Sequence, residues 1–331
     1  MLKRRSLWFE GGCRVSVREE ELPHPSAGEV LVETRVSAIS PGTEMLFYRG
    51  QLDEGAAVDS VLEGCRGGVT YPLRYGYASV GRITGVGQGV DPAAVGRLVF
   101  AFQPHASLCC MKAEQAMAVP EGIGAEEAAF LANAETAVNL VLDSRPLLGE
   151  RVSVFGLGVV GLLTAGLLAR FPLDRLRGFD LHPLRRAAAG TLGITASDPA
   201  AGSPPAGTED LAVEVSGSAD GFRLALASCG FAGRVVVGSW YGTGSRQQAF
   251  DTQFHRNRVR IVSSQVSTID PAISGRWTRE RRTEAAWQAI RALRPSRLVT
   301  HRIPFSQAAD AYRLIAEAPE TTIQVMLIHG S

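Results

Sequence analysis

The stretch that decides the fold is Val152-Ser153-Val154-Phe155-Gly156-Leu157-Gly158-Val159-Val160-Gly161, in which three glycines follow an apolar, β-branched run. The first glycine permits a sharp turn off a strand, and the second lets the backbone approach a pyrophosphate. The third lets the next helix pack closely on the sheet, with its N-terminal amides facing the phosphates. The pattern therefore predicts a dinucleotide site made by Gly156, Gly158, Val159, Val160 and Gly161.

An acidic residue, Asp180, stands nineteen residues after the last of these glycines, at the end of a second predicted strand. A carboxylate at this distance can accept hydrogen bonds from both ribose hydroxyls of an adenosine half. We therefore expect NAD as the cofactor, with NADP as the alternative because Arg185 lies close by in the chain. A structural turn with an incidental aspartate is the competing interpretation, and it leaves the strand before Asp180 unexplained.

Beyond the glycines, strands and helices alternate as in a doubly wound parallel sheet, which is an α/β fold. Six strands are predicted, at 151–155, 177–180, 194–196, 211–215, 234–238 and 259–263. Residues 197–207 are rich in proline and glycine, so they predict a surface loop without a helix.

The N-terminal part of the chain has a different pattern and predicts a β-rich, barrel-like domain. Short strand patterns separated by Gly and Pro turns occur at 14–19, 29–37, 80–86 and 98–102. A helix over 125–143 is expected to lead into the nucleotide domain. The C-terminal part predicts a strand at 299–303, a helix over 306–318 with Ser306 as its N-cap, and a strand at 324–328. The expected domains are 1–124 with 268–331, and 125–267.

Composition narrows the class of protein. The chain has 331 residues, is 45% hydrophobic and carries a formal net charge of +1, which allows two domains and disfavours nucleic-acid or membrane-surface partners. Five cysteines without a Cys-x-x-Cys pair and the lack of a signal-peptide pattern predict a cytoplasmic protein. The uncharged run 152–169 is long enough for a membrane span, but its glycines favour a buried strand and helix.

Phrases along nearly the whole chain resemble the medium-chain dehydrogenase/reductase superfamily, which includes alcohol dehydrogenase and quinone oxidoreductase. Besides the glycine turn, they are Gly28-Glu29-Val30-Leu31-Val32, Pro41-Gly42-Thr43-Glu44, Gly76-Tyr77-Ala78-Ser79-Val80-Gly81, Glu214-Val215-Ser216-Gly217 and Gly233-Arg234-Val235-Val236-Val237-Gly238. The resemblance implies a GroES-like barrel, a Rossmann domain, a small-molecule substrate in the interdomain cleft and a homodimer that pairs near 259–263. It adds Arg185, Ser216, Gly217 and Gly238 to the expected cofactor contacts.

Within the superfamily, the wording of 39–44 and 71–81 is most similar to the branch that contains bacteriochlorophyllide dehydrogenase. That family oxidises a hydroxyethyl side chain on a tetrapyrrole with NAD. Divergent relatives share the same phrases, so the resemblance leaves the substrate open.

Zinc-dependent members of the superfamily carry their catalytic ligands where this chain has Pro41, Tyr77 and Ala132. The four-cysteine structural lobe of those enzymes is missing as well. Zinc in proteins needs about three protein ligands with an open fourth position. The resemblance therefore implies a member without zinc.

Without a metal, the substrate oxygen needs a hydrogen-bond donor or an acid. Tyr77 is the natural candidate, and the alternative is that its ring only fills the space of a metal site. Thr43 matches a hydroxyl that relays the substrate proton, while Glu44 matches the acid beside it and is better read as structural than as a base. Leu46 replaces the histidine that would extend the relay. Thr136 matches a threonine that packs near the nicotinamide.

Other polar residues have weaker functional interpretations. His105 is a second possible acid, although a lone loop histidine is more often at the surface or structural. The basic residues at 255–258 and 276–282 could receive an anionic substrate, but a solvated face is the preferred interpretation. The leading function is metal-independent hydride transfer between NAD(H) and an alcohol/ketone pair. The alternatives are a zinc-free enone or quinone (C=C) reductase and a catalytically silent NAD(H)-binding sensor or structural protein.

Overall fold

The computed structural model describes residues 1–53, 55, 68–202, 204–243, 250 and 252–330. The chain forms two compact units, Met1–Ala132 with Val299–Ser331, and Asn133–Leu298. The sequence placed these divisions at 124/125 and 267/268 instead. Helix α9 (Arg279–Leu293) accounts for much of the difference, because its Leu293 side chain lies against Gly166 of helix α4 (Val159–Leu168) in the second unit.

The first unit is β-rich, as predicted. Among its described residues, a sheet runs in the order β14-β15-β3-β4-β5-β7, with β6 also paired to β3, and β1 and β2 form a separate hairpin. The strands are β1 (Leu2–Phe9), β2 (Val15–Leu22), β3 (Glu29–Ala38), β4 (Ser79–Val86), β5 (Leu98–Ala101), β6 (Leu108–Lys112), β7 (Met117–Ala118), β14 (Val299–Pro304) and β15 (Gln324–Ile328). Strands β6 and β7 were not predicted.

The alternation of buried and more exposed side chains shows which face of β3 packs on a core. From Glu29 to Arg35 in β3, the buried residues Val30, Val32 and Thr34 alternate with more exposed ones, which is the period of a strand with one face on a core. A second core gathers helix α1 (Glu44–Tyr48), the hairpin and helix α10 (Ala308–Glu317).

Helix α10 buries Ala308, Ala311, Tyr312 and Ile315, a spacing that places them on one helical face. The prediction of Ser306 as its N-cap was wrong, because Gln307 is the N-cap and makes no side-chain cap bond. Ser306 lies in a preceding 3₁₀ turn instead. The buried ring of Phe305 anchors that turn in the core.

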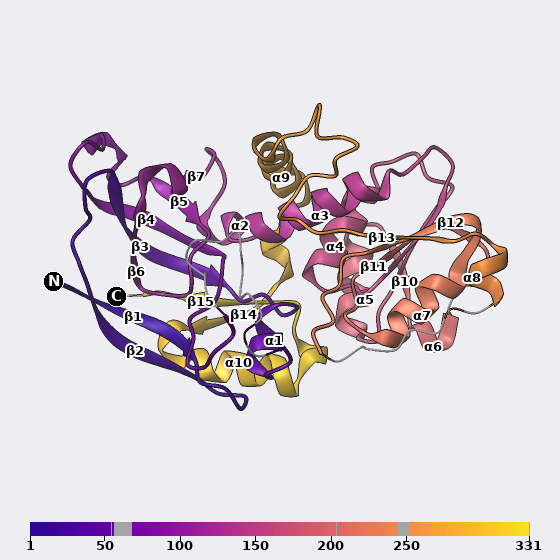
Figure 1. Ribbon diagram of the computed structural model, residues 1–331, viewed down its shortest axis with the longest axis horizontal. Coiled ribbons are helices and arrows are strands. Elements are labelled where there is room, and N and C mark those ends of the chain that lie inside the picture. Colours follow the sequence, from indigo (N-terminus) through magenta and orange to yellow (C-terminus); the bar gives the residue numbers. More distant parts are fainter. Residues whose placement is uncertain (54, 56–67, 203, 244–249, 251, 331) are drawn as a thin grey trace. The chain divides into compact units, whose positions relative to one another are not determined.

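The second unit contains, among its described residues, a six-stranded parallel sheet in the order β10-β9-β8-β11-β12-β13. Figure 1 labels β10, β11, β12 and β13 of this sheet among the helices of the unit. Its strands are β8 (Arg151–Phe155), β9 (Arg175–Phe179), β10 (Thr195–Ser197), β11 (Glu209–Glu214), β12 (Cys229–Val237) and β13 (Arg260–Ser263). Its helices include α3 (Leu131–Ser144), α4, α5 (Pro183–Thr191), α6 (Pro199–Gly202), α7 (Ala219–Ser228), α8 (Thr252–Arg256) and α9. The order reverses between β8 and β11, which is where doubly wound sheets bind their ligands.

Two local predictions between residues 125 and 207 need correction. The expected helix over 125–143 is divided into α2 (Ala125–Ala128) and α3. The loop at 197–207 contains the short helix α6, because Asp198 Oδ1 accepts a hydrogen bond from Ala200 N and Pro199 occupies a first-turn position that needs no N–H donor. Residue 203 of that loop lies outside the described residues.

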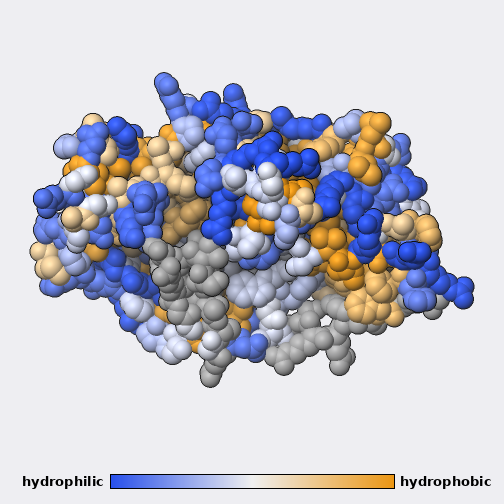
Figure 2. Space-filling view, turned by 45° about the horizontal axis from the view of Figure 1, so that its top comes forward, coloured by the Kyte–Doolittle hydropathy of each residue, from blue (hydrophilic) through white to orange (hydrophobic). Residues whose placement is uncertain are grey.

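Hydrophobic residues on the surface and along the helices bear on the question of a membrane span. On the face in Figure 2, hydrophobic residues form small patches between hydrophilic ones. The uncharged run 152–169 forms β8 and α4, as predicted. Among the residues that the structure describes, none of the helices combines the length and the apolar character that a membrane crossing requires.

Candidate functional site

The glycine turn lies between β8 and α4 in a geometry that only glycine can supply. Gly156 has a φ of +94°, and a Cβ there would lie 2.5 Å from the Ser216 Cα atom. A Cβ at Gly161 would lie 1.9 Å from the Gly156 carbonyl oxygen. Gly158, the N-cap of α4, has open space where its Cβ would point. The turn therefore fits a pyrophosphate, because its backbone can approach a ligand at the helix N-terminus.

Asp180 follows β9 and joins two loops. Its Oδ2 atom accepts a hydrogen bond of 2.7 Å from Leu157 N, and Oδ1 accepts one of 2.8 Å from His182 N. Arg185 Nη1 lies 3.6 Å from Oδ2. Each carboxylate oxygen has a second lone pair, so the buried carboxylate can bridge these loops and still accept from ribose hydroxyls.

The ends of β11 and β12 complete this site. Gly238 N donates to the Glu214 carbonyl oxygen, and Gly217 N donates to Ser239 Oγ over 2.9 Å. The structure therefore brings Ser216, Gly217 and Gly238 together with the glycine turn. Val159 and Val160 begin α4, and Thr136 lies on α3.

One residue at this edge was missed as a site residue. Glu214 is fully buried and accepts hydrogen bonds from Ser216 N (2.7 Å), from Ser216 Oγ (2.5 Å) and from the Tyr241 hydroxyl. Burial and the neighbouring Glu214 raise the pKa of Tyr241. The carboxylate thus fixes the loop that lies against Gly156. Its place at a strand's carboxyl end was the available signal.

A second group of polar residues gathers in the first unit, just before β4. The Tyr77 hydroxyl donates to Ser40 Oγ over 2.5 Å and lies 3.4 Å from Thr43 Oγ1. Ser40 and Thr43 both lie between β3 and α1. The structure therefore brings Tyr77 and Thr43 together, as their proposed roles require, and it adds Ser40, which the sequence did not single out.

Glu44, the first residue of α1, is fully buried beneath this group. Its Oε1 accepts from Ser40 N over 2.9 Å, and its Oε2 lies 3.0 Å from His105 Nε2 and accepts from the Tyr312 hydroxyl. Burial, with the adjacent carboxylate, raises the pKa of Tyr312, so this phenol keeps its proton and remains a donor. These contacts are those of a structural carboxylate.

His105 is fully buried in the loop between β5 and β6, which excludes the surface position and agrees with the structural one of the two expected alternatives. Its Nδ1 atom lies 2.7 Å from Ser37 Oγ, which lies 2.9 Å from His329 Nε2. Burial lowers the pKa of His329 to about 3, so that ring is neutral. A Cβ at Gly76 would lie 2.6 Å from the His105 ring, which places the imidazole against the backbone next to Tyr77.

The basic clusters have structural contacts. Arg282 is buried, which was not expected of a solvated face, and it donates to Asn139 Oδ1 (3.1 Å) and to the Val266 carbonyl oxygen (2.5 Å). Its Nε atom lies 3.8 Å from Glu135, whose pKa burial raises. Arg281 stacks on Trp277. By contrast, His255 and Arg256 are exposed in the last turn of α8, as predicted for a solvated face.

No group of three His, Cys, Asp or Glu side chains suited to a metal ion occurs among the described residues. Cys13, Cys109, Cys110 and Cys229 are free thiols, while Cys65 lies outside those residues.

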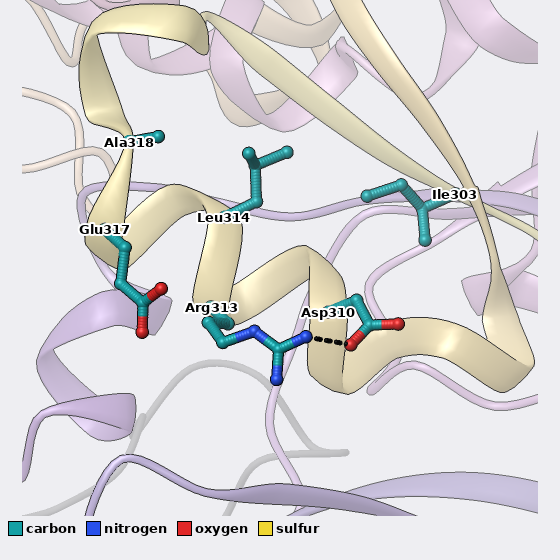
Figure 3. Close-up of a pocket in the computed structure, with 6 residues that line it drawn as sticks. All are labelled: Ile303, Asp310, Arg313, Leu314, Glu317 and Ala318. Carbon is teal, nitrogen blue, oxygen red and sulfur yellow. Dashed lines mark hydrogen bonds and ion pairs between the residues drawn. The ribbon is translucent and has the colours of Figure 1, made fainter.

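A pocket of about 350 Å³ lies along α10 and β14 (Figure 3). Its lining residues are Ile303, Asp310, Arg313, Leu314, Glu317 and Ala318. Arg313 donates to Asp310 at its rim. The pocket shares no residue with the predicted site.

Comparison with known proteins places these features in context. No protein-family model matches the chain. It is similar to YphC of Escherichia coli K-12, an uncharacterized zinc-type alcohol dehydrogenase-like protein, with 25% identity over 353 residues that cover 93% of this chain and 94% of YphC. It is 24% identical to D-guloside 3-dehydrogenase of the same organism over 328 residues, which cover 90% of this chain and 92% of that protein.

Solved structures show the same architecture. RspB of E. coli CFT073, complexed with NADH, matches with a TM-score of 0.77 and 20% identity over 98% of this chain and 99% of its own. A zinc-binding dehydrogenase from Sinorhizobium meliloti, bound to NADP, matches with a TM-score of 0.78 and 20% identity over 99% of this chain and 100% of its own. The chain therefore has the GroES-like plus Rossmann fold of the medium-chain alcohol dehydrogenases, as predicted.

The glycine turn yields a paired prediction. Gly161→Ala should destabilise the protein by roughly 2 kcal/mol or more, because its Cβ would overlap the Gly156 carbonyl oxygen. Gly158→Ala has space for its Cβ, so it should unfold near the wild-type urea midpoint but bind NADH at least about tenfold more weakly. Urea unfolding and NADH fluorescence titration check both variants. Wild-type NADH affinity in Gly158→Ala would contradict a pyrophosphate at this turn.

Proposed function

We propose that this protein is a metal-independent oxidoreductase that transfers a hydride between NAD(H) and an alcohol or ketone. The observation that carries the proposal is the cluster of three side-chain hydroxyls, those of Tyr77, Ser40 and Thr43. It occupies the segments in which the zinc-dependent relatives hold their metal, and Pro41, Tyr77 and Ala132 stand at the ligand positions. None of these three side chains supplies a thiolate or an imidazole.

The nicotinamide, when bound, donates or accepts the hydride at its C4 atom. The chain must then orient the substrate and move one proton at the substrate oxygen. In reduction, the Tyr77 hydroxyl gives its proton to that oxygen as the C–H bond forms, and in oxidation it takes the proton back. Thr43 contacts the same oxygen. Glu44 holds the turn that carries Thr43, since its carboxylate accepts from Ser40 N.

The finer assignment within the superfamily is also a proposal. The phrases at 39–44 and 71–81 support the branch that contains bacteriochlorophyllide dehydrogenase. A cytoplasmic location is supported by the free thiols of the described residues. The substrate class comes from the alcohol and sugar dehydrogenases among the relatives.

Cofactor choice can be tested without knowing the substrate. NADH should bind more tightly than NADPH, by roughly tenfold, because the Asp180 carboxylate accepts from ribose hydroxyls and repels a 2′-phosphate. The guanidinium of Arg185, 3.6 Å from that carboxylate, moderates the preference. Fluorescence titration with both reduced cofactors measures it, and equal or tighter NADPH binding would argue against the assignment.

The expected assembly is a homodimer. Strand β13 forms one edge of the parallel sheet, and Ile261 on it is 38% exposed. An accessible sheet edge favours pairing with a second copy about a twofold axis. Light scattering at micromolar protein concentration should give the mass of two chains, whereas a clean monomer would remove this expectation.

Tyr77→Phe tests the chemistry. It keeps the ring and should leave NADH affinity nearly unchanged, but it should lower kcat by roughly 10² to 10⁴, the usual contribution of a positioned acid or base. Steady-state kinetics on a panel of ketones and enones with NADH provide the measurement. Thr43→Val is the matched variant.

Each outcome of that experiment has a clear meaning. A ketone turned over with the predicted Tyr77→Phe loss supports the proposal, whereas turnover of enones alone indicates a C=C reductase. Tight NADH binding without any turnover indicates a sensor or structural protein. A Tyr77→Phe enzyme within about twofold of wild type, with Thr43→Val more damaging, would show that Tyr77 only fills space.

A further inference from the structure

Ser40 is placed where it can act on the Tyr77 oxygen. Its side chain is buried at the end of the segment that follows β3, and its Oγ atom lies 2.5 Å from the Tyr77 hydroxyl oxygen. Thr43 Oγ1 is more distant, at 3.4 Å, which is near the limit of a hydrogen bond. Of the Ser40 and Thr43 hydroxyls, that of Ser40 is therefore the closer to the Tyr77 oxygen.

We propose that Ser40 is a positioning residue for proton transfer by Tyr77. The Ser40 hydroxyl donates a hydrogen bond to the Tyr77 oxygen once the phenol has given up its proton. The proposal rests on the proposed function and deepens it, because it assigns a role at the same site to Ser40, which the sequence did not single out.

The chemistry of the step balances. In reduction, the bound cofactor would supply the hydride for the new C–H bond, and the Tyr77 O–H bond breaks as its proton passes to the substrate oxygen. Tyr77 is left as a phenolate, and solvent water later returns its proton. A serine hydroxyl is both donor and acceptor and rotates freely about its C–O bond. Ser40 can therefore accept from the neutral phenol, as seen, and then donate to the phenolate.

The surroundings hold Ser40 in place for this exchange. Its backbone N–H donates to Glu44 Oε1, and its carbonyl oxygen accepts from Glu44 N. Glu44 in turn is held by Tyr312 of α10 and His105 of the loop before β6. The Ser40 backbone is thus fixed from both sides while its hydroxyl remains free to turn toward Tyr77.

The titratable groups around Tyr77, among the described residues, come from several elements. Tyr75 meets the Tyr77 ring edge to face, with centroids 5.9 Å apart. The Glu44 carboxylate lies behind the Ser40 turn, and the His105 imidazole lies against Gly76. A carboxylate at this place disfavours the negative charge of a Tyr77 phenolate, so a hydroxyl donor is needed to stabilise that phenolate.

The test follows the ionisation of Tyr77 itself and needs no substrate. The near-ultraviolet absorbance of tyrosinate is titrated against pH in each protein and in the same protein carrying Tyr77→Phe, and the difference isolates Tyr77. Ser40→Ala should raise the Tyr77 ionisation midpoint by about one to two pH units, the worth of one hydrogen bond to a charged group. Ser40→Thr keeps a hydroxyl and should restore most of the wild-type value.

Ser37→Ala is the matched control. Ser37 is a buried serine in the same network, but its hydroxyl bonds the rings of His105 and His329 instead. It should therefore leave the Tyr77 midpoint nearly unchanged. If Ser40→Ala does not fold, as judged by circular dichroism, the variant Ser40→Gly takes its place, because it removes the same hydroxyl.

An unchanged midpoint in Ser40→Ala, or an equal shift in Ser37→Ala, would overturn the proposal while the proposed function stands on the Tyr77→Phe kinetics. Conversely, full turnover in Tyr77→Phe would defeat the proposed function and with it the catalytic role of Ser40. A selective Ser40→Ala shift, rescued by Ser40→Thr, supports the proposal.

Discussion

The buried carboxylate of Glu44 is the interaction on which the candidate chemistry of the first unit depends. A carboxylate removed from water must find compensating donors, because its desolvation costs several kcal/mol. Here the donors are Ser40 N, the His105 ring and the Tyr312 hydroxyl, which come from three separate parts of the chain. These hydrogen bonds therefore fix the 40–44 turn, the loop before β6 and the middle of α10 around the Glu44 carboxylate.

That arrangement gives the hydroxyls of Ser40 and Thr43 a defined position beside Tyr77. A zinc ion would polarise a substrate oxygen directly as a Lewis acid. A neutral phenol polarises the substrate oxygen less than a metal cation does. Its effectiveness therefore depends on a fixed geometry and on partners that stabilise its ionised form. In this account, the buried network beneath Tyr77 supplies the rigidity, and Ser40 supplies the partner.

The cofactor half of the fold was predictable because its signals are local. The glycine turn works through backbone geometry within ten residues, and the position of Asp180 follows from the length of one strand–helix–strand unit. The residues around Tyr77 were only partly predictable. The pairing of Thr43 with Tyr77 followed from the resemblance, but the contact of Ser40 with Tyr77 and the burial of His105 join segments 37 and 61 residues apart. No local pattern encodes such contacts. The predictions for Arg282 and for the N-cap of α10 were wrong for the same reason, because burial against distant residues overrode the local preference.

Metal content tests the central claim most directly. The protein is expressed in zinc-supplemented medium, purified without chelators, shown to bind NADH, and analysed for zinc by mass spectrometry. The account predicts no stoichiometric zinc, because the resemblance to zinc-dependent dehydrogenases aligns their ligand positions with Pro41, Tyr77 and Ala132 of this chain. About one zinc per chain, the load of a catalytic site, would contradict it.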